Sequence, residues 1–578
     1  MKKNNNLKEV RKKLMGDFTS CHRFKRFVIL LLQLAEALLQ ISIPWILQST
    51  INAITVEMSV KIFVRAITLA VIIIFSMIFI SYIKTRIQNT YMFCFNAYMK
   101  DKLFAKMMSK SVVEFKNNNS GEYLSVYQTD VQKITDLYIN GKWGIVSSLT
   151  LCVLGIISMI KMSPKLALII LIVQIIPISI TLMLGIKLPV YHEEFSAKRG
   201  AFSAATQDYL KGFRLIKAFA TEKVFINKFS YNNKVVESSG KRVLDKAIGI
   251  NLINYVANYI LIIAMFFIGG LEVLNGKMQV GTIIACFELF QTISQPFTEL
   301  AMQFNNVRTA DGTFERINKL FYSDTIDLQE DIKKNKNLLN EITSIRLNDV
   351  SFSYNKEKVT LDNVSYEFIN GRKYAIVGDS GSGKTTLMNL LLGYYPNYKG
   401  NITINDHELN DYSSEQINKK ISIVQQDVFI FDDSLKANLT LGREFTDEQL
   451  NSAIQRAGLS EFVYKNGLDY ICGEDGNNLS GGEKQRISIA RALLRDSGVI
   501  FFDEVTSSLD NCTTIAIEET IKSLDKTCIA ITHKLNLNVL RNYDEVLVFK
   551  EGKLVESGTV DELIENNQYF YSLYTFSK

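Results

Sequence analysis

The sequence predicts a multidomain membrane protein, in which an all-α domain of six spans precedes an α/β domain. Three observations support this fold class. The 578 residues exceed one ordinary domain, and 47% hydrophobic with 21% charged residues fits a membrane part joined to a soluble part. About six apolar segments near membrane-spanning length lie before residue 320. After residue 345, short β-branched or aromatic runs alternate with helical runs, as around a parallel core sheet.

The N-terminal residues are rich in Lys and Arg before the first apolar segment begins. Such a cluster marks the cytoplasmic side by the positive-inside rule. A nucleic-acid-binding patch is the competing interpretation, and the apolar segment that follows directly argues against it, so no nucleic-acid partner is expected. The cluster consists of Lys2, Lys3, Lys8, Arg11, Lys12, Lys13, Arg23, Lys25 and Arg26.

The membrane domain is expected over residues 1–320. Its predicted spans lie near 27–47, 62–84, 143–161, 165–188, 248–269 and 281–303. The connections after spans one, three and five are short (the first at about 48–61), whereas those after spans two and four are long and charged. The long connections and both termini are therefore expected on the cytoplasmic side of the cell membrane. Amphipathic spacing in the long connections indicates helices that continue out of the membrane.

Residues 321–344 form a predicted linker rich in Asp, Lys and Asn, and the second domain spans 345–578. The seven cysteines are scattered without a C-x-x-C pair, which suggests neither a zinc site nor a disulfide framework.

A phosphate-binding loop is the first chemical motif of the second domain. It follows an apolar strand at Lys373–Val377 and precedes a helical run at Thr385–Leu392, the context that G-x-x-x-x-G-K-[ST] requires. Lys384 is expected to reach the β- and γ-phosphates of ATP, and the Thr385 hydroxyl to bind Mg²⁺. The loop with the next residue is Gly378, Asp379, Ser380, Gly381, Ser382, Gly383, Lys384, Thr385 and Thr386.

Two acids follow a hydrophobic strand at Val499–Phe502. Asp503 is expected to hold Mg²⁺, directly or through water. Glu504 stands where the chain leaves the sheet and can orient and deprotonate the attacking water. Because a phosphate loop precedes this pair, the sequence predicts nucleotide hydrolysis.

The pentapeptide Leu479–Glu483 narrows the prediction. Ser480, Gly481 and Gly482 offer a hydroxyl and unhindered backbone N–H groups, which suit a second phosphate contact. With these motifs in place, the chain resembles the ABC transporter family, and in particular an exporter-type half-transporter. The resemblance implies a P-loop ATPase domain that contains a helical subdomain.

The resemblance also implies roles for single residues. Tyr354 matches the aromatic residue that stacks on adenine, although a core-packing strand aromatic is the alternative. Gln426 matches the glutamine that contacts Mg²⁺ and the membrane half. His533 matches the switch histidine near the γ-phosphate, and Asp510 matches the D-loop acid.

Relatives of this kind form head-to-tail pairs, so Ser480 and Gly482 are expected to complete the ATP site of a second half-transporter. Every motif element is retained, which favours a homodimer over a heterodimer. Two positions depart from the family pattern: Gln425 stands where many relatives have Pro, and Glu483 where they usually have Gln. ATP binding is expected to survive the second departure.

Polar residues recur at helical spacing on three spans, which predicts a polar cavity for a cationic or hydrogen-bonding cargo, a small molecule or a peptide. Helix–helix hydrogen bonding is the alternative interpretation. The residues are Gln33, Glu36 and Gln40, then Asn251, Asn254 and Asn258, then Glu288, Gln291 and Gln295, with Glu299 nearer the cytoplasmic end.

The architecture favours ATP-driven export by alternating access, with membrane lipid around the spans. Three alternatives stay open: an importer on the same scaffold, for example of a metal chelate; a lipid flippase; and a non-transporting switch gated by ATP.

Overall fold

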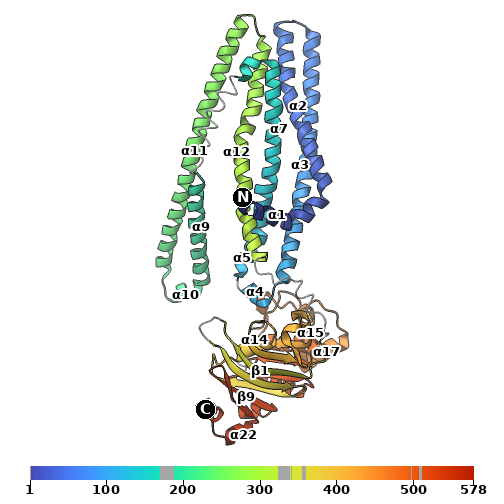
Figure 1. The fold of residues 1–578 in the computed structure, drawn as a ribbon, viewed down its shortest axis with the longest axis vertical. Coiled ribbons are helices and arrows are strands. Elements are labelled where there is room, and N and C mark those ends of the chain that lie inside the picture. Colours follow the sequence, from blue (N-terminus) through green and yellow to red (C-terminus); the bar gives the residue numbers. More distant parts are fainter. Residues whose placement is uncertain are drawn as a thin grey trace. The chain divides into compact units, whose positions relative to one another are not determined.

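The chain folds into two compact units in a computed structural model, which describes residues 2–577 except 117, 169–187, 323–338, 340, 355–358, 496 and 507–510. The first unit comprises Met1–Ser109 and Asn118–Ser323. The second comprises Lys110–Asn117 and Asp324–Lys578. The first unit is helical and the second is α/β (Figure 1).

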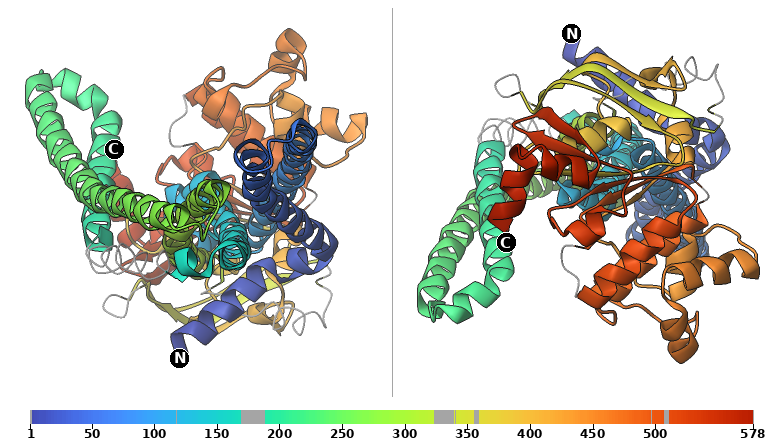
Figure 2. Two further views of the ribbon diagram at one scale, coloured as in Figure 1. Left: turned by 90° about the horizontal axis from the view of Figure 1, so that it is seen from above. Right: turned by 90° about the horizontal axis from the view of Figure 1, so that it is seen from below.

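Long helices build the first unit. Figures 1 and 2 show α9 lying beside α11, with the short α10 between them in the chain. The helices are α1 (Lys2–Cys21), α2 (Arg23–Thr55), α3 (Val60–Met108), the run from α5 (Ser120–Ser125) to α7 (Asn140–Met162), α9 (Leu188–Lys211), α10 (Phe213–Ala218), α11 (Glu222–Leu274) and α12 (Val280–Tyr322).

Three helical stretches of the described chain are long and apolar enough to cross a membrane: Arg23–Thr55, Val60–Met108 and Ser120–Met162. A shorter apolar helix, Asn258–Leu274, overlaps the predicted fifth span, and the predicted sixth span lies within α12. Most of the predicted fourth span, 169–187, lies outside the described residues.

Several helices extend past the spans predicted from hydropathy. The 49 residues of α3 and the 53 of α11 far exceed the roughly 20 that cross a bilayer. The first connection is shorter than expected, because α2 continues to Thr55. The amide of Gln48 donates to the Thr282 hydroxyl at 2.8 Å and that of Asn52 to the side-chain oxygen of Gln279 at 2.6 Å, so polar residues past the span join α2 to the start of α12.

The run Ser120–Met162 contains two π-helical stretches, Val126–Asp130 and Ile134–Ile139. After them, glycines of α7 lie against α12. A Cβ atom at Gly155 would lie 2.5 Å from Ile293, and one at Gly141 would lie 2.9 Å from Val307. These two positions therefore allow α7 and α12 to approach more closely than larger side chains would permit.

A six-stranded sheet forms the centre of the second unit, in the order β10-β9-β3-β8-β7-β6. Five strands are parallel, and only β10 runs antiparallel, beside β9. All five residues of β8 are buried, because both faces of the sheet are covered. The strands are β3 (Lys373–Gly378), β6 (Ile421–Val424), β7 (Val499–Asp503), β8 (Thr527–Ile531), β9 (Glu545–Lys550) and β10 (Lys553–Gly558).

A second, antiparallel sheet has the order β2-β1-β4-β5 and was not distinguished by the sequence pattern. Its inner face and the parallel sheet enclose a core that includes Leu347, Phe368 and Phe501. The two sheets together make the α/β domain mixed rather than purely parallel. The strands are β1 (Ser344–Phe352), β2 (Leu361–Ile369), β4 (Lys399–Ile404) and β5 (His407–Glu408).

Helices of the second unit cover the parallel sheet and build a helical part between β6 and β7 (Figure 2). They are α14 (Lys384–Leu391), α15 (Ser414–Lys420), α16 (Leu435–Thr440), α17 (Asp447–Arg456), α18 (Ser460–Asn466), α19 (Gly481–Leu494), α20 (Asn511–Ser523), α21 (Leu537–Leu540), α22 (Val560–Glu565) and α23 (Tyr569–Ser577). The short α4 (Val112–Lys116) is also assigned to this unit.

Candidate functional site

The phosphate loop joins β3 to α14, as predicted from its flanking runs. Gly378 has a φ of +146°, and a Cβ atom there would lie 2.2 Å from the Phe549 carbonyl oxygen. Only glycine fits, because the loop turns directly against the neighbouring strand β9. Gly552, in the turn after β9, donates its N–H to the Ser382 carbonyl at 3.1 Å, so a second hydrogen bond from this part of the chain holds the loop.

Lys384 lies inside this loop and is 4% exposed. Its ammonium donates to the carbonyls of Gly378 and Asp379 at 2.9 and 2.8 Å. Burial lowers the pKa of Lys384, and the negative charges of Glu504, Asp379 and Asp503 act in the opposite direction. A phosphate held by the loop would contact the Lys384 ammonium, whose position the two backbone carbonyls already fix.

Glu504 is the central group of the site. It directly follows β7, with a φ of +51°, and its N–H donates to the Ile531 carbonyl at 3.0 Å. Gln426 Nε2 donates to Glu504 Oε2 at 3.1 Å, and His533 Nε2 lies 2.8 Å from Oε1. Three residues that the sequence placed in one site, from three separate strand ends, therefore meet at one carboxylate.

Asp503 is the last residue of β7, and its environment suits a cation ligand. Burial raises the pKa of Asp503, and the adjacent Glu504 charge raises it further, whereas His533 and Lys384 lower it. Two neighbouring carboxylates repel each other unless a cation lies between or beside them. With the Thr385 hydroxyl and the Gln426 amide oxygen, Asp503 offers the oxygen ligands that Mg²⁺ prefers.

Gln485 belongs to the site, and sequence reasoning missed it. This residue of α19 is 4% exposed, and its amide donates to the Gln426 carbonyl at 2.7 Å. The bond joins the segment after β6 to α19, whose first turn contains Gly481 and Gly482. Its burial and its bond to Gln426 depend on the packing of α19 against the segment after β6, which no sequence motif marks.

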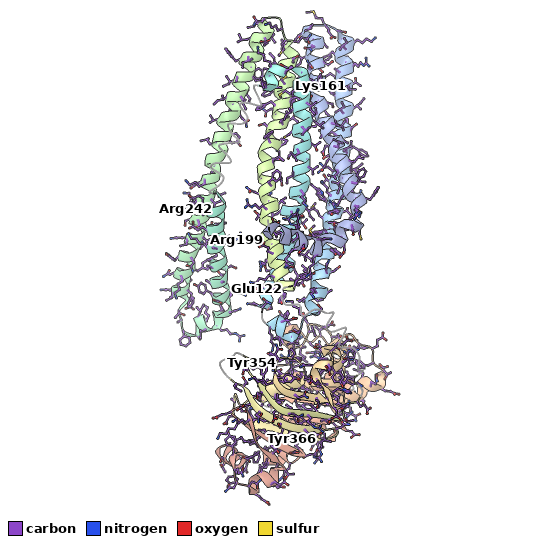
Figure 3. The ribbon with its side chains drawn as sticks, viewed as in Figure 1. Glu122, Lys161, Arg199, Arg242, Tyr354 and Tyr366 are labelled. Carbon is purple, nitrogen blue, oxygen red and sulfur yellow. The ribbon has the colours of Figure 1, made fainter. Side chains whose placement is uncertain are left out.

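Tyr354 belongs to the second unit (Figure 3) and contacts the first turn of α14, directly after the phosphate loop. Its hydroxyl is 3.1 Å from the Thr386 hydroxyl, and its ring meets those of Phe352 and Tyr395 edge-on at 5.0 and 5.2 Å. The residue is 48% exposed, so one ring surface is open to solvent and able to stack on a base. A fully buried core aromatic would not offer such a surface.

The pentapeptide Leu479–Glu483, which resembles the signature motif of the family, leads into α19. Ser480 is the N-cap residue, and its hydroxyl accepts the Glu483 N–H at 3.3 Å. The Glu483 carboxylate in turn accepts the Ser480 N–H at 2.7 Å, which completes a capping box. The unusual Glu483 therefore stabilises the helix start on which Gly481 and Gly482 lie.

In the described part of the chain, no hydrogen bond joins Leu479–Glu483 to the phosphate loop of the same chain. The predicted D-loop residue Asp510 lies outside the described residues. Both assignments, to the partner's ATP and to the D-loop, stay predictions.

A tyrosine of the C-terminal helix also reaches the phosphate loop. The Tyr569 hydroxyl donates to Asp379 at 2.5 Å, and the Lys550 ammonium lies 4.4 Å from its ring centre. Glu556 accepts the Tyr569 backbone N–H at 2.6 Å and holds the start of α23. Burial, and next the hydrogen bond to Asp379, raise the pKa of Tyr569 to about 12. The partners are 190 positions apart in the chain, so sequence reasoning could not find this contact.

The first unit contains a polar cavity of about 350 Å³ that joins residues from α2, α7 and α12. Glu36 is outside its lining and forms an ion pair with Lys84, while Gln33 is buried and donates to the Trp143 carbonyl at 3.4 Å. Asn258 accepts a bond from Ser294 at 3.1 Å. The side chains of Asn251 and Asn254 lie outside the description. The cavity is lined by Gln40, Leu151, Glu288, Gln291, Thr292, Gln295, Pro296 and Glu299.

Comparisons with known proteins find matches for both the membrane part and the ATP-binding part of the chain. The ABC transporter transmembrane region matches residues 27–297, and the ABC transporter family matches residues 361–507. The chain is 29% identical to the uncharacterized ABC transporter ATP-binding protein YfiC of Bacillus subtilis, over 82% of this chain and 79% of that protein.

Two further relatives and one structure extend the comparison. Identity is 27% to the multidrug resistance-like ATP-binding protein MdlB of Buchnera aphidicola, covering 90% of this chain and 89% of that protein. It is 30% to the ATP-dependent lipid A-core flippase of Vibrio parahaemolyticus, over 65% of each. A bacterial Atm1-family ABC exporter with ATP bound has the same fold, with a TM-score of 0.84, 21% identity, and coverage of 96% of this chain and 99% of that one.

Proposed function

Because the chain belongs to the ABC transporter family, with its transmembrane region and ATP-binding domain in one polypeptide, we propose that it exports a small molecule or peptide from the cytoplasm as a homodimer. The hydrolysis of ATP drives this transport. The observation that supports the proposal most directly is the Glu504 carboxylate, which Gln426 and His533 hold within electrostatic reach of Lys384.

Glu504 is the proposed general base. A water molecule attacks the γ-phosphorus, its proton passes to the Glu504 carboxylate, and the bond from phosphorus to the ADP oxygen breaks. Lys384 neutralises charge on the transferred phosphoryl group. His533 and Gln426 fix the orientation of the base. Mg²⁺, when bound by Thr385, Asp503 and Gln426, supplies further neutralisation of the phosphate charge.

The second phosphate contact is proposed to come from the partner chain. Ser480 and the first N–H groups of α19 form a helix N-terminus, which favours an anion. If each subunit supplies this terminus to the other's ATP, binding closes the pair and biases the membrane halves toward one of two states. A homodimer fits best, since Lys384, Glu504 and the signature are all present in this chain.

The polar cavity of the first unit is the proposed cargo contact. Glu288 lines it, together with four other amide or carboxylate side chains, Gln40, Gln291, Gln295 and Glu299. An unpaired carboxylate within a span is costly unless it faces water or a partner. The sequence grouped Glu36 with Glu288 as possible cargo contacts. Because Glu36 is paired with Lys84, we assign the cargo contact to Glu288 alone.

The transport assay uses proteoliposomes whose ATP-binding units face outward. A fluorescent cationic peptide should accumulate inside on addition of ATP with the parent protein, and Lys384→Ala should abolish the accumulation. Glu288→Gln should lower it at least tenfold, whereas Glu36→Gln, the matched control, should change it little because the Glu36 carboxylate already has a partner.

Each alternative has its own outcome in this assay. ATP-dependent translocation of a labelled lipid without peptide accumulation would favour a flippase, in keeping with the names of several relatives. ATP-dependent loss of peptide from preloaded vesicles would favour an importer. ATP binding without net movement of either probe would favour a gated switch.

A further inference from the structure

A second cavity in the first unit has a different chemical character. Its volume is about 540 Å³, and it lies among α1, α2, α3 and the start of α7. Four basic residues line it, Arg11, Lys12, Arg26 and Lys142, and no carboxylate does. The cavity shares no lining residue with the polar cargo cavity described above.

The amphipathic helix α1 forms one wall of this cavity. Its residues Leu7, Val10, Leu14 and Phe18 are at most 8% exposed and face the unit. The Phe18 ring packs edge-on against Tyr91 of α3, with the ring centres 5.2 Å apart. The helix is therefore fixed to the membrane domain, and its basic residues occupy defined positions.

The positive charges of the cavity are only partly balanced. Arg11 forms an ion pair with Asp311, but its Nε is buried without a hydrogen-bond acceptor. Lys142 donates to the neutral hydroxyl of Tyr138 at 2.7 Å. Within the described residues, Lys12 and Arg26 form no ion pair. Of the four lining cations, only Arg11 forms an ion pair within the described residues, so the cavity attracts an anion.

The other lining residues are those of a membrane boundary. Arg26 directly precedes the first predicted span, and Leu30 on the next helical turn also lines the cavity. Trp143 and Val146 belong to the start of the third predicted span. Tryptophan is typical of the level of lipid headgroups. The cavity therefore joins a cationic region to an apolar one at that level.

We propose that this cavity binds a phosphate-bearing anionic lipid. The phosphate would lie among Arg11, Lys12, Arg26 and Lys142, and the first acyl carbons along Leu30, Trp143 and Val146. Basic pockets between membrane helices bind anionic headgroups in this way. A free phosphate shares the headgroup chemistry but would leave the apolar side of the cavity without a partner.

The chain suits a direct optical test, since it contains two tryptophans, Trp45 and Trp143. In full-length Trp45→Phe protein, fluorescence reports on Trp143 in the cavity wall. Two preparations of phosphatidylcholine nanodiscs are compared, one with brominated phosphatidylglycerol and one with the same fraction of brominated phosphatidylcholine. In both lipids the bromine lies near the glycerol end of one acyl chain. Greater quenching by the anionic lipid is expected, and equal quenching by the two lipids would overturn the proposal without any further variant.

Charge variants then locate the site. The triple variant Lys12→Gln, Arg26→Gln and Lys142→Gln should lower the relative affinity for phosphatidylglycerol about a hundredfold, because each basic residue contributes about fivefold. The matched control removes three basic residues that do not line the cavity: Lys8→Gln, Arg23→Gln and Lys25→Gln. An equal loss in both triple variants would contradict a localised site.

A last arm separates the two sources of phosphate. Added inorganic phosphate should leave the quenching by phosphatidylglycerol unchanged if the cavity holds a lipid. Relief of the quenching at millimolar phosphate would show that the cavity takes the free ion instead, and the lipid proposal would fail.

Discussion

Replacing Glu504 by Gln removes the proton acceptor but can keep the hydrogen bonds around it. The carboxylate accepts a bond from Gln426 at 3.1 Å and lies 2.8 Å from His533 Nε2. In the variant, the amide oxygen can accept from Gln426, and the amide nitrogen can donate to a neutral His533 whose Nε2 carries no proton. Gln is as compatible as Glu with the φ of +51° at this position.

The expected magnitude follows from the lost function of the base. Positioned general bases contribute about 10²- to 10⁴-fold, which corresponds to roughly 3–5 kcal/mol of activation free energy. ATP binding should remain, because Lys384 and the phosphate loop are unchanged. The ATP-bound, closed dimer should then accumulate.

The assay measures phosphate release and the retention of labelled ATP by full-length protein in nanodiscs. Glu504→Gln should lose turnover and retain ATP. Glu504→Ala should lose turnover and retain less ATP, since Gln426 and His533 lose their acceptor at a cost of about 1–3 kcal/mol. Glu519→Gln, on the exposed side of α20, is the matched control and should behave like the parent. Normal turnover in Glu504→Gln would refute the assignment of the base.

Three further substitutions test other parts of the second unit. Glu483→Gln keeps the capping box but removes a negative charge beside the proposed site of the partner's phosphates, so ATP affinity should rise severalfold at low salt and converge on the parent value at high salt. Tyr569→Phe removes the hydrogen bond to Asp379 and should raise the KM for ATP about fivefold, equivalent to about 1 kcal/mol. Burial raises the pKa of Glu518 to about 7 from 4.5, so the folded state binds this proton more tightly than the unfolded state. Stability should therefore fall as pH rises from 4.5 to about 7, by about 3 kcal/mol at most, and Glu518→Gln should melt higher than the parent at pH 8 but not at pH 4 in thermal unfolding scans.

Each of these expectations has a contrary result. Weaker ATP binding in Glu483→Gln at low salt would mean that the carboxylate matters more for the helix than for the partner's phosphates. Tyr571→Phe, on the same helix, is the control. An unchanged KM for ATP in Tyr569→Phe would mean that the hydrogen bond to Asp379 does not contribute to ATP binding. A melting temperature of Glu518→Gln that follows the parent at every pH would place the titrating proton elsewhere.

Motif spacing predicted the parts of the structure that depend on local chain geometry. The strand before Gly378, the helix after Lys384 and the strand ending at Asp503 are all present, because each motif requires its flanking element. The family and the exporter fold followed from these motifs together with hydropathy, and the comparisons confirm both. The antiparallel sheet was missed, since its edge pairing has no comparable signature.

Contacts between distant segments could not be predicted. The bond from Tyr569 to Asp379 joins positions that are 190 residues apart, and the ion pair between Lys84 and Glu36 depends on how α2 packs against α3. Helical spacing placed Glu36 on a polar face but could not identify its partner. For the same reason, the sequence predicted one polar cavity, whereas the described part of the membrane unit contains further cavities, among them a cationic one.

The two π-helical stretches between Ser120 and Met162 fix the rotational phase of α7. A π-helical turn accommodates one residue more than an α-helical turn, and one residue corresponds to about 100° of rotation. The extra residues thus determine that Gly141 and Gly155 face α12, where a Cβ atom would collide. Deleting one residue from Ile134–Ile139 would turn this face away and bring larger side chains toward α12. The π-helical turns therefore determine which residues of α7 face α12.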